Sequence, residues 1–200
     1  MTTVSHSGIS PQTLPIQSIC VYCGSSPGHD QAYREDALKL GKCIAEAGIR
    51  LIYGGGKTGL MGAIADAVLQ AGGSVVGVIP HALNTRELAH DSLTELIRVT
   101  DMHERKMTMA SLADAFVAMP GGIGTMDEFF EIFTWQQLSF HVKPCAVLDT
   151  ASYYEHLLIF LAHMTRQGFL GSNQLDRLMV ARSPDQVIPL LSGSARALNP

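Results

Sequence analysis

The chain has 200 residues, of which 46% are hydrophobic and 16% are charged, and this composition excludes a disordered protein and suffices for one buried core. The net charge of −4 argues against general electrostatic binding to nucleic acid or to an anionic membrane. No apolar run is long enough to span a bilayer. Residues 1–15 contain neither a basic start nor an apolar segment, so we expect a flexible N-terminal tail and a cytoplasmic protein.

Apolar runs typical of strands alternate with helical patterns along the rest of the chain. We expect strands over residues 17–23, 49–55, 74–80, 95–100, 114–120, 145–149 and 177–181. We expect helices over residues 31–48, 60–72, 101–113, 124–140 and 152–168, and a short helix that SPDQ begins at residues 183–186. Strands this rich in Val, Ile and Ala are buried on both faces, as in a parallel sheet covered by helices. The pattern predicts a doubly wound, Rossmann-like α/β fold with helices on both faces, as a single nucleotide-binding domain over residues 16–200.

Four cysteines occur, and two of them form a C-x-x-C pair at Cys20 and Cys23. This spacing is found in redox pairs and in half-sites for zinc, but here it falls inside a predicted strand. Side chains three positions apart in a strand point to opposite faces, and no second C-x-x-C or H-x-x-x-H follows. We therefore expect buried, inert thiols and no metal site.

Three glycine-rich loops, CGSSPG, YGGGKTG and PGGIGT, each follow a predicted strand. Ligands of doubly wound sheets bind beyond the carboxyl ends of the strands, so the loops mark one candidate site. Gly24 and Ser25 belong to the first loop. YGGGKTG is not a Walker P-loop, because the required first glycine is replaced by Leu51, and the first loop does not match the dinucleotide pattern G-x-G-x-x-G. A tight turn alone would explain two of the three consecutive glycines, and the third suggests close approach to a ligand.

PGGIGT precedes a predicted helix, so its backbone N–H groups and the helix N-terminus suit a phosphate, with the Thr125 hydroxyl as a further donor. Asp127 and Glu128 follow in the first helical turns, where acids often only stabilise the helix dipole. That role suffices for Asp127. Glu128 and Glu131 share a helix face that borders the loop, so one of them is a candidate for chemistry.

The segment MHERK, residues 102–106, begins another predicted helix at the same sheet edge. A charge run on a helix is usually a solvated face. Here the guanidinium of Arg105 could instead bind phosphate or pair with a carboxylate. We expect His103 to be exposed or satisfied, and the methionines to be core residues.

These motifs resemble those of the LOG ("lonely guy") family of cytokinin riboside 5′-monophosphate phosphoribohydrolases, long mislabelled as lysine decarboxylases. PGGIGTMDE matches every fixed position of the family pattern PGGxGTxxE, and MHERK matches its upstream M-H-x-R-K segment. CVYCGSS, YGGGKTGLMG, GVIP, TWQQL and HVKP are also similar, so the resemblance covers about residues 17–190.

The resemblance implies hydrolysis of the N-glycosidic bond of an N6-modified AMP to the free base and ribose 5-phosphate, without a metal or cofactor. It implies that Arg105 and Glu128 are the catalytic pair and that Gly122, Gly124 and Thr125 hold the phosphate. The other residues that it places in the nucleotide site are Gly24, Ser25, Glu87, Met102, Lys106, Gly121, Ile123, Met126, Asp127 and Thr134. It also implies a homodimer, in which part of the aromatic helix after Glu128 could face the partner; core packing explains those aromatic residues equally well.

The residues fit this chemistry in part. A carboxylate stabilises the positive charge that develops on the ribose and can orient the attacking water, and we expect the nearby arginine and helix N-terminus to keep Glu128 ionised. Arg105 stays protonated, so its role is to orient Glu128 or the nucleotide. The alternatives are an AMP nucleosidase and a nucleotide-binding module without hydrolase activity. Pyridoxal phosphate chemistry is disfavoured, since nothing around Lys57, Lys106 or Lys143 marks a Schiff-base lysine.

Overall fold

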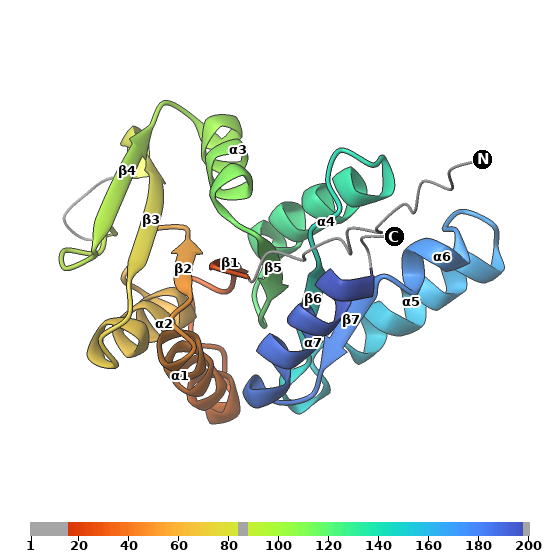
Figure 1. The fold of residues 1–200 in the computed structure, drawn as a ribbon, viewed down its shortest axis with the longest axis horizontal. Helices are drawn as coiled ribbons and strands as arrows, with labels where there is room; N and C mark the ends of the chain where they lie inside the picture. Colours follow the sequence, from red (N-terminus) through yellow and green to blue (C-terminus); the bar gives the residue numbers. More distant parts are fainter. Residues whose placement is uncertain (1–15, 84–87, 198–200) are drawn as a thin grey trace, which may run out of the picture.

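The structure, a computed structural model, describes residues 16–83 and 88–197, without the side chains of residues 194–197. Seven parallel strands form one sheet in the order β4-β3-β2-β1-β5-β6-β7 (Figure 1). Their bounds are β1 (Ser18–Tyr22), β2 (Arg50–Tyr53), β3 (Val75–Pro80), β4 (Glu95–Val99), β5 (Ala115–Ala118), β6 (Cys145–Leu148) and β7 (Leu178–Ala181). The predicted doubly wound α/β fold is therefore confirmed.

The strand order reverses at β1, which pairs with β2 on one side and with β5 on the other. The registers Ile19–Leu51 and Ile19–Ala115 align these three strands, so their carboxyl ends lie at the same edge. The chain moves outward through β2, β3 and β4, then returns to the other side of β1 and continues through β6 and β7. Such a switch point leaves a crevice between the loops that follow its strands.

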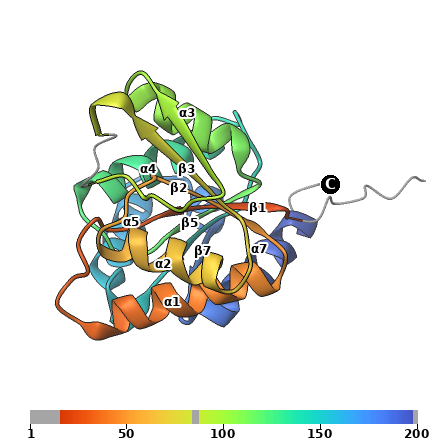
Figure 2. The same cartoon turned by 90° about the vertical axis from the view of Figure 1, so that its left-hand side faces the viewer.

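Helices cover both faces of the sheet (Figure 2). One face packs against α1 (Gln31–Glu46), α2 (Gly59–Gln70) and α7 (Pro184–Ala197). The other face packs against α3 (Met102–Leu112), α4 (Ile123–Gln137) and α5 (Glu155–Arg166). The short elements are α6 (Ser172–Leu175) and the two 3₁₀ turns η1 (His81–Leu83) and η2 (Thr150–Ser152).

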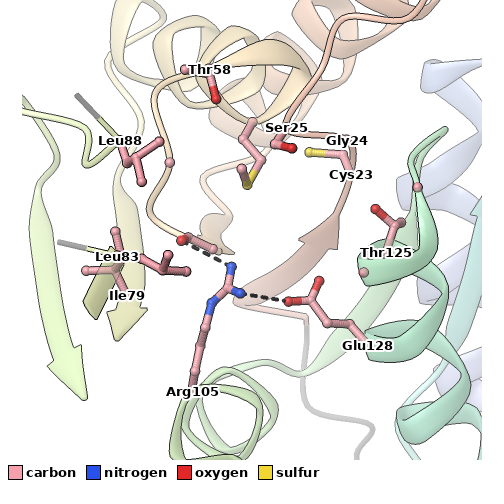
Figure 3. Close-up of a pocket in the computed structure, with 15 residues that line it drawn as sticks. Cys23, Gly24, Ser25, Thr58, Ile79, Leu83, Leu88, Arg105, Thr125 and Glu128 are labelled. Carbon is pink, nitrogen blue, oxygen red and sulfur yellow. Dashed lines mark hydrogen bonds and ion pairs between the residues drawn. The ribbon is translucent and has the colours of Figure 1, made fainter. Parts of the chain in front are cut away.

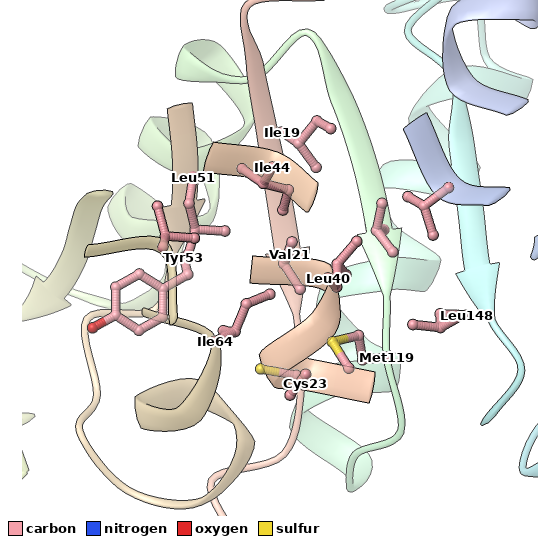
Figure 4. Close-up of a cluster of buried hydrophobic side chains, with 14 of the residues drawn as sticks. Ile19, Val21, Cys23, Leu40, Ile44, Leu51, Tyr53, Ile64, Met119 and Leu148 are labelled. Atoms are coloured by element: carbon pink, nitrogen blue, oxygen red, sulfur yellow. The ribbon is translucent and has the colours of Figure 1, made fainter. Parts of the chain in front are cut away.

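The spacing of apolar residues explains how α1 is held against the sheet. Ala37, Leu40 and Ile44 recur at helical intervals on one side of α1, and all three are fully buried. Figure 4 shows Leu40 and Ile44 within the core cluster. The helix begins where the Asp30 carboxylate accepts a hydrogen bond from the Ala32 N–H at 2.9 Å. Burial of a side chain such as Leu40 contributes about 2 kcal/mol, so this stripe fixes α1 beside the strand that leads into the first glycine loop.

The expected strands are all present, and the differences lie in the helices. The helix expected from residue 152 begins at Glu155 because Ala151 and Ser152 adopt positive φ angles that a helix cannot contain. The last helix spans 14 residues rather than the short segment expected, and α6 was not predicted. The expected tail over residues 1–15 lies outside the described residues.

The two thiols of the C-x-x-C pair lie in the protein core. Cys20 and Cys23 are free thiols buried in core clusters on opposite faces of the sheet, which confirms the prediction from strand geometry. Burial raises the pKa of both thiols, which keeps them protonated and inert. Over residues 16–83 and 88–197, no helix has the length and apolar character to cross a membrane. The cytoplasmic location stays a prediction.

Candidate active site

A cavity of about 330 Å³ opens at the carboxyl ends of β1, β2 and β5 (Figure 3). Its volume is at the lower end of the range that small-molecule sites occupy. All three glycine-rich loops contribute to it, which confirms their predicted convergence. The lining residues are Cys23, Gly24, Ser25, Gly54, Gly56, Thr58, Met61, Ile79, Leu83, Leu88, Arg105, Gly122, Gly124, Thr125 and Glu128.

Arg105 crosses the floor of the cavity from the first turns of α3. Its side chain is only 11% exposed, and each nitrogen of the guanidinium has a partner. Nε donates to the Val78 carbonyl at 3.1 Å, and Nη2 donates to the Gly54 carbonyl at 3.2 Å. Nη1 lies 3.3 Å from Glu128 Oε1 (Figure 3). The two carbonyls fix the direction of the guanidinium, which in turn fixes the carboxylate.

The approach of Arg105 also explains one glycine of the YGGGKTG loop. A Cβ added at Gly54 would lie 1.9 Å from Arg105 Nη2, so a larger residue would displace the guanidinium from its present position. The run of three consecutive glycines had suggested that a ligand closely approaches this loop. At Gly54 the group that approaches is this protein's own guanidinium.

Glu128 extends from α4 into the cavity opposite the β2 loop, and its side chain is 11% exposed. Burial raises the pKa of this carboxyl group, and the neighbouring Arg105 only partly opposes that effect. Asp127 adds a second negative charge nearby, which acts in the same direction as burial. Burial and Asp127 thus act against the ionised carboxylate, and Arg105 acts for it; the expectation that Glu128 is ionised at neutral pH stays a prediction. The sequence shows the charges but not the loss of solvent.

In PGGIGT, the irregular segment ends at Gly122, which is the N-cap of α4, and the last three residues form the first turn of that helix from Ile123. Gly122 and Gly124 line the cavity, and a Cβ at either would meet no described atom within 4 Å, so open space lies beside this backbone. Thr125 is 4% exposed and lines the same wall. A helix N-terminus beside open space and a hydroxyl is suited to a phosphate.

Five of the expected site residues lie on the cavity wall beside the pair of Arg105 and Glu128: Gly24, Ser25, Gly122, Gly124 and Thr125. Gly121 lies just behind the wall, because a Cβ there would be 2.1 Å from Thr125 Oγ1. Met102 contacts Arg105 from outside the cavity, with its sulfur 3.8 Å from Nη1.

Other expected site residues gather on the outer side of α4. Lys106 Nζ lies 3.1 Å from Glu131 Oε2 and 3.3 Å from Asp127 Oδ2. Burial alone would lower the pKa of Lys106, but these two carboxylates outweigh it and the pKa is raised. Ile123, Met126, Asp127 and Thr134 line a shallow hollow on this side. The structure thus separates the predicted residues into a cavity group and an outer group, and Glu87 lies outside the described residues.

An apolar wall was missed by the sequence analysis. Ile79, Leu83 and Leu88 line the cavity on the side of β3 and η1, opposite the PGGIGT loop (Figure 3), and Met61 of α2 adds a further apolar side chain. The one available signal was that GVIP ends a strand at the same edge as the glycine loops. An aliphatic wall facing a phosphate-type loop suits a ligand with one charged end and one apolar end.

The cavity contains no lysine among its lining residues in the described part of the chain. In the same part of the chain, no group of three or more His, Cys, Asp or Glu side chains is placed to hold a metal ion. Among the described residues, the polar side chains that line the cavity are those of Arg105 and Glu128 and the hydroxyls of Ser25, Thr58 and Thr125.

The sheet and the position of the cavity at its switch point define a doubly wound protein of the α/β class with a ligand site beyond the carboxyl ends of its strands. A family model described as "Possible lysine decarboxylase" matches residues 61–191. A cytokinin riboside 5′-monophosphate phosphoribohydrolase of Rhodococcoides fascians is 44% identical over 90% of this chain and 92% of its own length. The corresponding LOG2 protein of Arabidopsis thaliana is 43% identical over 86% of this chain and 81% of its own. The chain belongs to the LOG family.

Solved structures share the fold at lower identity. The molybdenum cofactor binding protein from Rippkaea orientalis has a TM-score of 0.66 and 21% identity, covering 90% of this chain and 96% of its own. The molybdenum cofactor carrier protein from Chlamydomonas reinhardtii has a TM-score of 0.67 and 20% identity, covering 88% of this chain and 96% of its own. This likeness shows the α/β architecture alone.

Proposed function

We propose that this protein hydrolyses the N-glycosidic bond of N6-modified adenosine 5′-monophosphates, releasing the free base and ribose 5-phosphate. The observation that carries the proposal is the buried pair of Arg105 and Glu128, 3.3 Å apart in a cavity that also holds the PGGIGT loop. Relatives named for this activity, 43–44% identical over most of the chain, support it.

The geometry suggests how the nucleotide lies. The phosphate binds to the backbone at Gly122 and Gly124 and to the Thr125 hydroxyl. Glu128 follows Thr125 by three residues, or roughly 4.5 Å along the helix axis, so its carboxylate is one helical step deeper in the cavity than the phosphate site. In the proposed binding mode, the ribose of the nucleotide lies beside this carboxylate.

Glu128 acts on the bond that breaks. As the bond between C1′ and the base nitrogen lengthens, its electron pair moves to the base and positive charge develops on the ribose. The Glu128 carboxylate stabilises that charge and orients a water, whose oxygen bonds to C1′ while its proton ends on the leaving base. Arg105 holds the carboxylate in place and favours its ionised form against the effect of burial.

The apolar wall favours an N6-modified nucleotide over plain AMP. Met61, Ile79, Leu83 and Leu88 offer an aliphatic surface that an isopentenyl substituent could cover, whereas the bare amino group of AMP gains nothing from it. The AMP nucleosidase alternative predicts release of base from AMP alone. The binding-module alternative leaves Glu128 without a role, since phosphate binding requires no carboxylate.

The family description as a possible lysine decarboxylase is not supported by the residues of the site. That chemistry requires a lysine that forms a Schiff base with pyridoxal phosphate. Lys57 lies 3.6 Å from Asp91, Lys106 is held by two carboxylates, and Lys143 donates to the Ala110 carbonyl at 2.9 Å. None of these lysines lines the cavity.

The test compares two substrates and two variants. We expect the wild type to cleave isopentenyladenosine 5′-monophosphate at least tenfold more efficiently than AMP, as kcat/KM. Glu128→Gln is expected to lose roughly 10²- to 10³-fold in kcat, the size of a lost electrostatic contact to the transition state. Glu95→Gln, an exposed acid on β4, is the matched control. Full turnover by Glu128→Gln would disprove the assigned role.

We also propose a homodimer. An apolar surface lies between α3 and the segment after α4, with Met107 56%, Leu138 56%, Phe140 73% and Val142 56% exposed. Met107 and Phe140 line a hollow of about 460 Å³ together with Trp135. The aromatic residues Phe129 and Phe133, by contrast, are buried in the core. An apolar surface of this kind suits a second copy of the chain. Light scattering would test this, and Phe140→Asp is expected to yield monomers.

A further inference from the structure

The turn after β6 has an unusual backbone. Ala151 and Ser152 are consecutive non-glycine residues with φ angles of 50° and 58°. Residues with a Cβ rarely adopt this left-handed region, and two in succession persist only where the surroundings impose them. The turn therefore holds the residues that follow it, Tyr153 and Tyr154, in a direction that a relaxed helix start would not give.

Buried polar contacts hold the turn in place. Asp149 is 2% exposed; its Oδ1 accepts a hydrogen bond from the Tyr154 N–H at 2.7 Å, and its Oδ2 pairs with Arg182. The Thr150 hydroxyl donates to Asp36 Oδ2 at 2.6 Å, which ties the turn to α1. Anchors on both sides make this turn a rigid support.

The two tyrosines reach back to the segment between β5 and α4. The Tyr154 hydroxyl donates to the Met119 carbonyl at 2.6 Å in the buried interior. The Tyr153 hydroxyl donates to the Gly121 carbonyl, also at 2.6 Å, at the protein surface. Adjacent residues of one rigid turn thus hold alternate carbonyls of the loop that precedes the proposed phosphate site.

The carbonyl between them is also occupied, because Pro120 accepts a hydrogen bond from the Gly24 N–H at 3.1 Å. Three successive carbonyls, of Met119, Pro120 and Gly121, therefore accept hydrogen bonds from groups outside the loop. A carbonyl that rotated toward the cavity would place a partial negative charge beside a bound phosphate. Because these three carbonyls are held away from the cavity, the backbone amides of the following turn, which begins at Gly122, can face the anion.

We propose that Tyr153 is a positioning residue for this phosphate loop, defined as residues 119–125. The inference rests on the proposed function, because it assumes that the loop binds the 5′-phosphate. Tyr153 is 41% exposed, and its ring packs edge-on against Tyr33 and Tyr154, with centroids 5.6 Å and 5.0 Å away. The ring contacts fix the side chain, and the hydroxyl fixes the Gly121 carbonyl.

Tyr153→Phe removes this hydroxyl and keeps the ring. We expect the variant to bind ribose 5-phosphate roughly 5- to 10-fold more weakly by calorimetry, the loss of about one hydrogen bond in the support of the loop. Binding of the free base isopentenyladenine is expected to stay unchanged. With the nucleotide monophosphate as substrate, KM is expected to rise by a similar factor while kcat stays within about twofold.

Tyr33→Phe is the matched control, since the Tyr33 hydroxyl makes no hydrogen bond to the described part of the chain and its ring belongs to the same cluster. Unchanged affinity of Tyr153→Phe for ribose 5-phosphate would overturn the inference. Equal weakening of base and ribose 5-phosphate would also overturn it, because a general structural defect would act on both. Failure of the wild type to bind ribose 5-phosphate would overturn the inference together with the phosphate site. A selective loss of ribose 5-phosphate binding in a protein that cleaves no nucleotide would support the inference and disprove the proposed function.

Discussion

Replacing Arg105 with lysine separates the charge of this residue from its geometry. Lysine keeps the positive charge but puts a methylene where Nε now donates to the Val78 carbonyl at 3.1 Å. A single ammonium cannot reproduce the fork that reaches both Gly54 and Glu128. The substitution therefore leaves one or two buried acceptors without a donor, while the ion pair with Glu128 can still form at altered geometry.

The structure gives the expected size of the effect. One unsatisfied buried acceptor costs about 1–3 kcal/mol of folding free energy. For a chain of this length that corresponds to roughly 2–10 °C in the midpoint of thermal unfolding. The carboxylate of Glu128 loses its fixed direction, and displacement of a catalytic group by about 1 Å can cost roughly 10²-fold in rate. We expect Arg105→Lys to lower kcat by about that factor and to change KM much less.

The assay is steady-state release of base from isopentenyladenosine 5′-monophosphate, with thermal unfolding measured on the same samples. Arg98→Lys is the matched control, because Arg98 is exposed on β4. Both kcat and stability of Arg98→Lys are expected to equal those of the wild type. If Arg105→Lys kept kcat within about threefold of the wild type, charge alone would suffice and the positional role of Arg105 would be refuted.

Three further predictions concern stability, phosphate and base. Burial raises the pKa of Glu128, so the folded protein keeps the carboxyl proton to a higher pH than the unfolded chain does. The stability that this proton contributes is lost as pH rises through the folded pKa. From about pH 4 upward, the unfolding temperature is therefore expected to fall less steeply with pH for Glu128→Gln than for the wild type, and equal slopes for the two proteins would contradict this. Thr125→Val is expected to raise KM for the nucleotide roughly 5- to 10-fold by removing a phosphate donor; an unchanged KM would argue against that contact. Leu88→Ala is expected to lower the preference for the isopentenyl nucleotide over AMP roughly tenfold, and an unchanged ratio of kcat/KM values would remove Leu88 from the base site.

The parts of the fold that rest on local patterns could be predicted from the sequence. Apolar runs such as SVVGVIP predicted the strands, and their alternation with helical patterns predicted the doubly wound sheet. The convergence of the three glycine loops followed from parallel topology alone. The late start of α5 could not be predicted, because the left-handed angles of Ala151 and Ser152 are imposed by tertiary contacts of Asp149 and Thr150.

Some features of the candidate site could likewise be predicted from sequence motifs, and others depend on tertiary structure. Motifs placed Arg105 and Glu128 on elements that meet at one edge, but their direct pairing depends on the space left by Gly54. The raised pKa of Glu128 depends on burial, which no local pattern reports. The apolar wall combines single apolar residues from separate segments, such as Ile79 of β3 and Leu83 of η1, which carry no motif.

In the proposed reaction, Glu128 drives hydrolysis of a nucleotide that the PGGIGT loop holds. The most direct measurement incubates the wild type with isopentenyladenosine 5′-monophosphate in ¹⁸O-labelled water and identifies both products by chromatography and mass spectrometry. The account predicts equal amounts of free isopentenyladenine and ribose 5-phosphate, with the label in the sugar product and no release by Glu128→Ala. Nucleotide that is bound by the wild type but recovered intact would contradict the account and identify a binding protein instead.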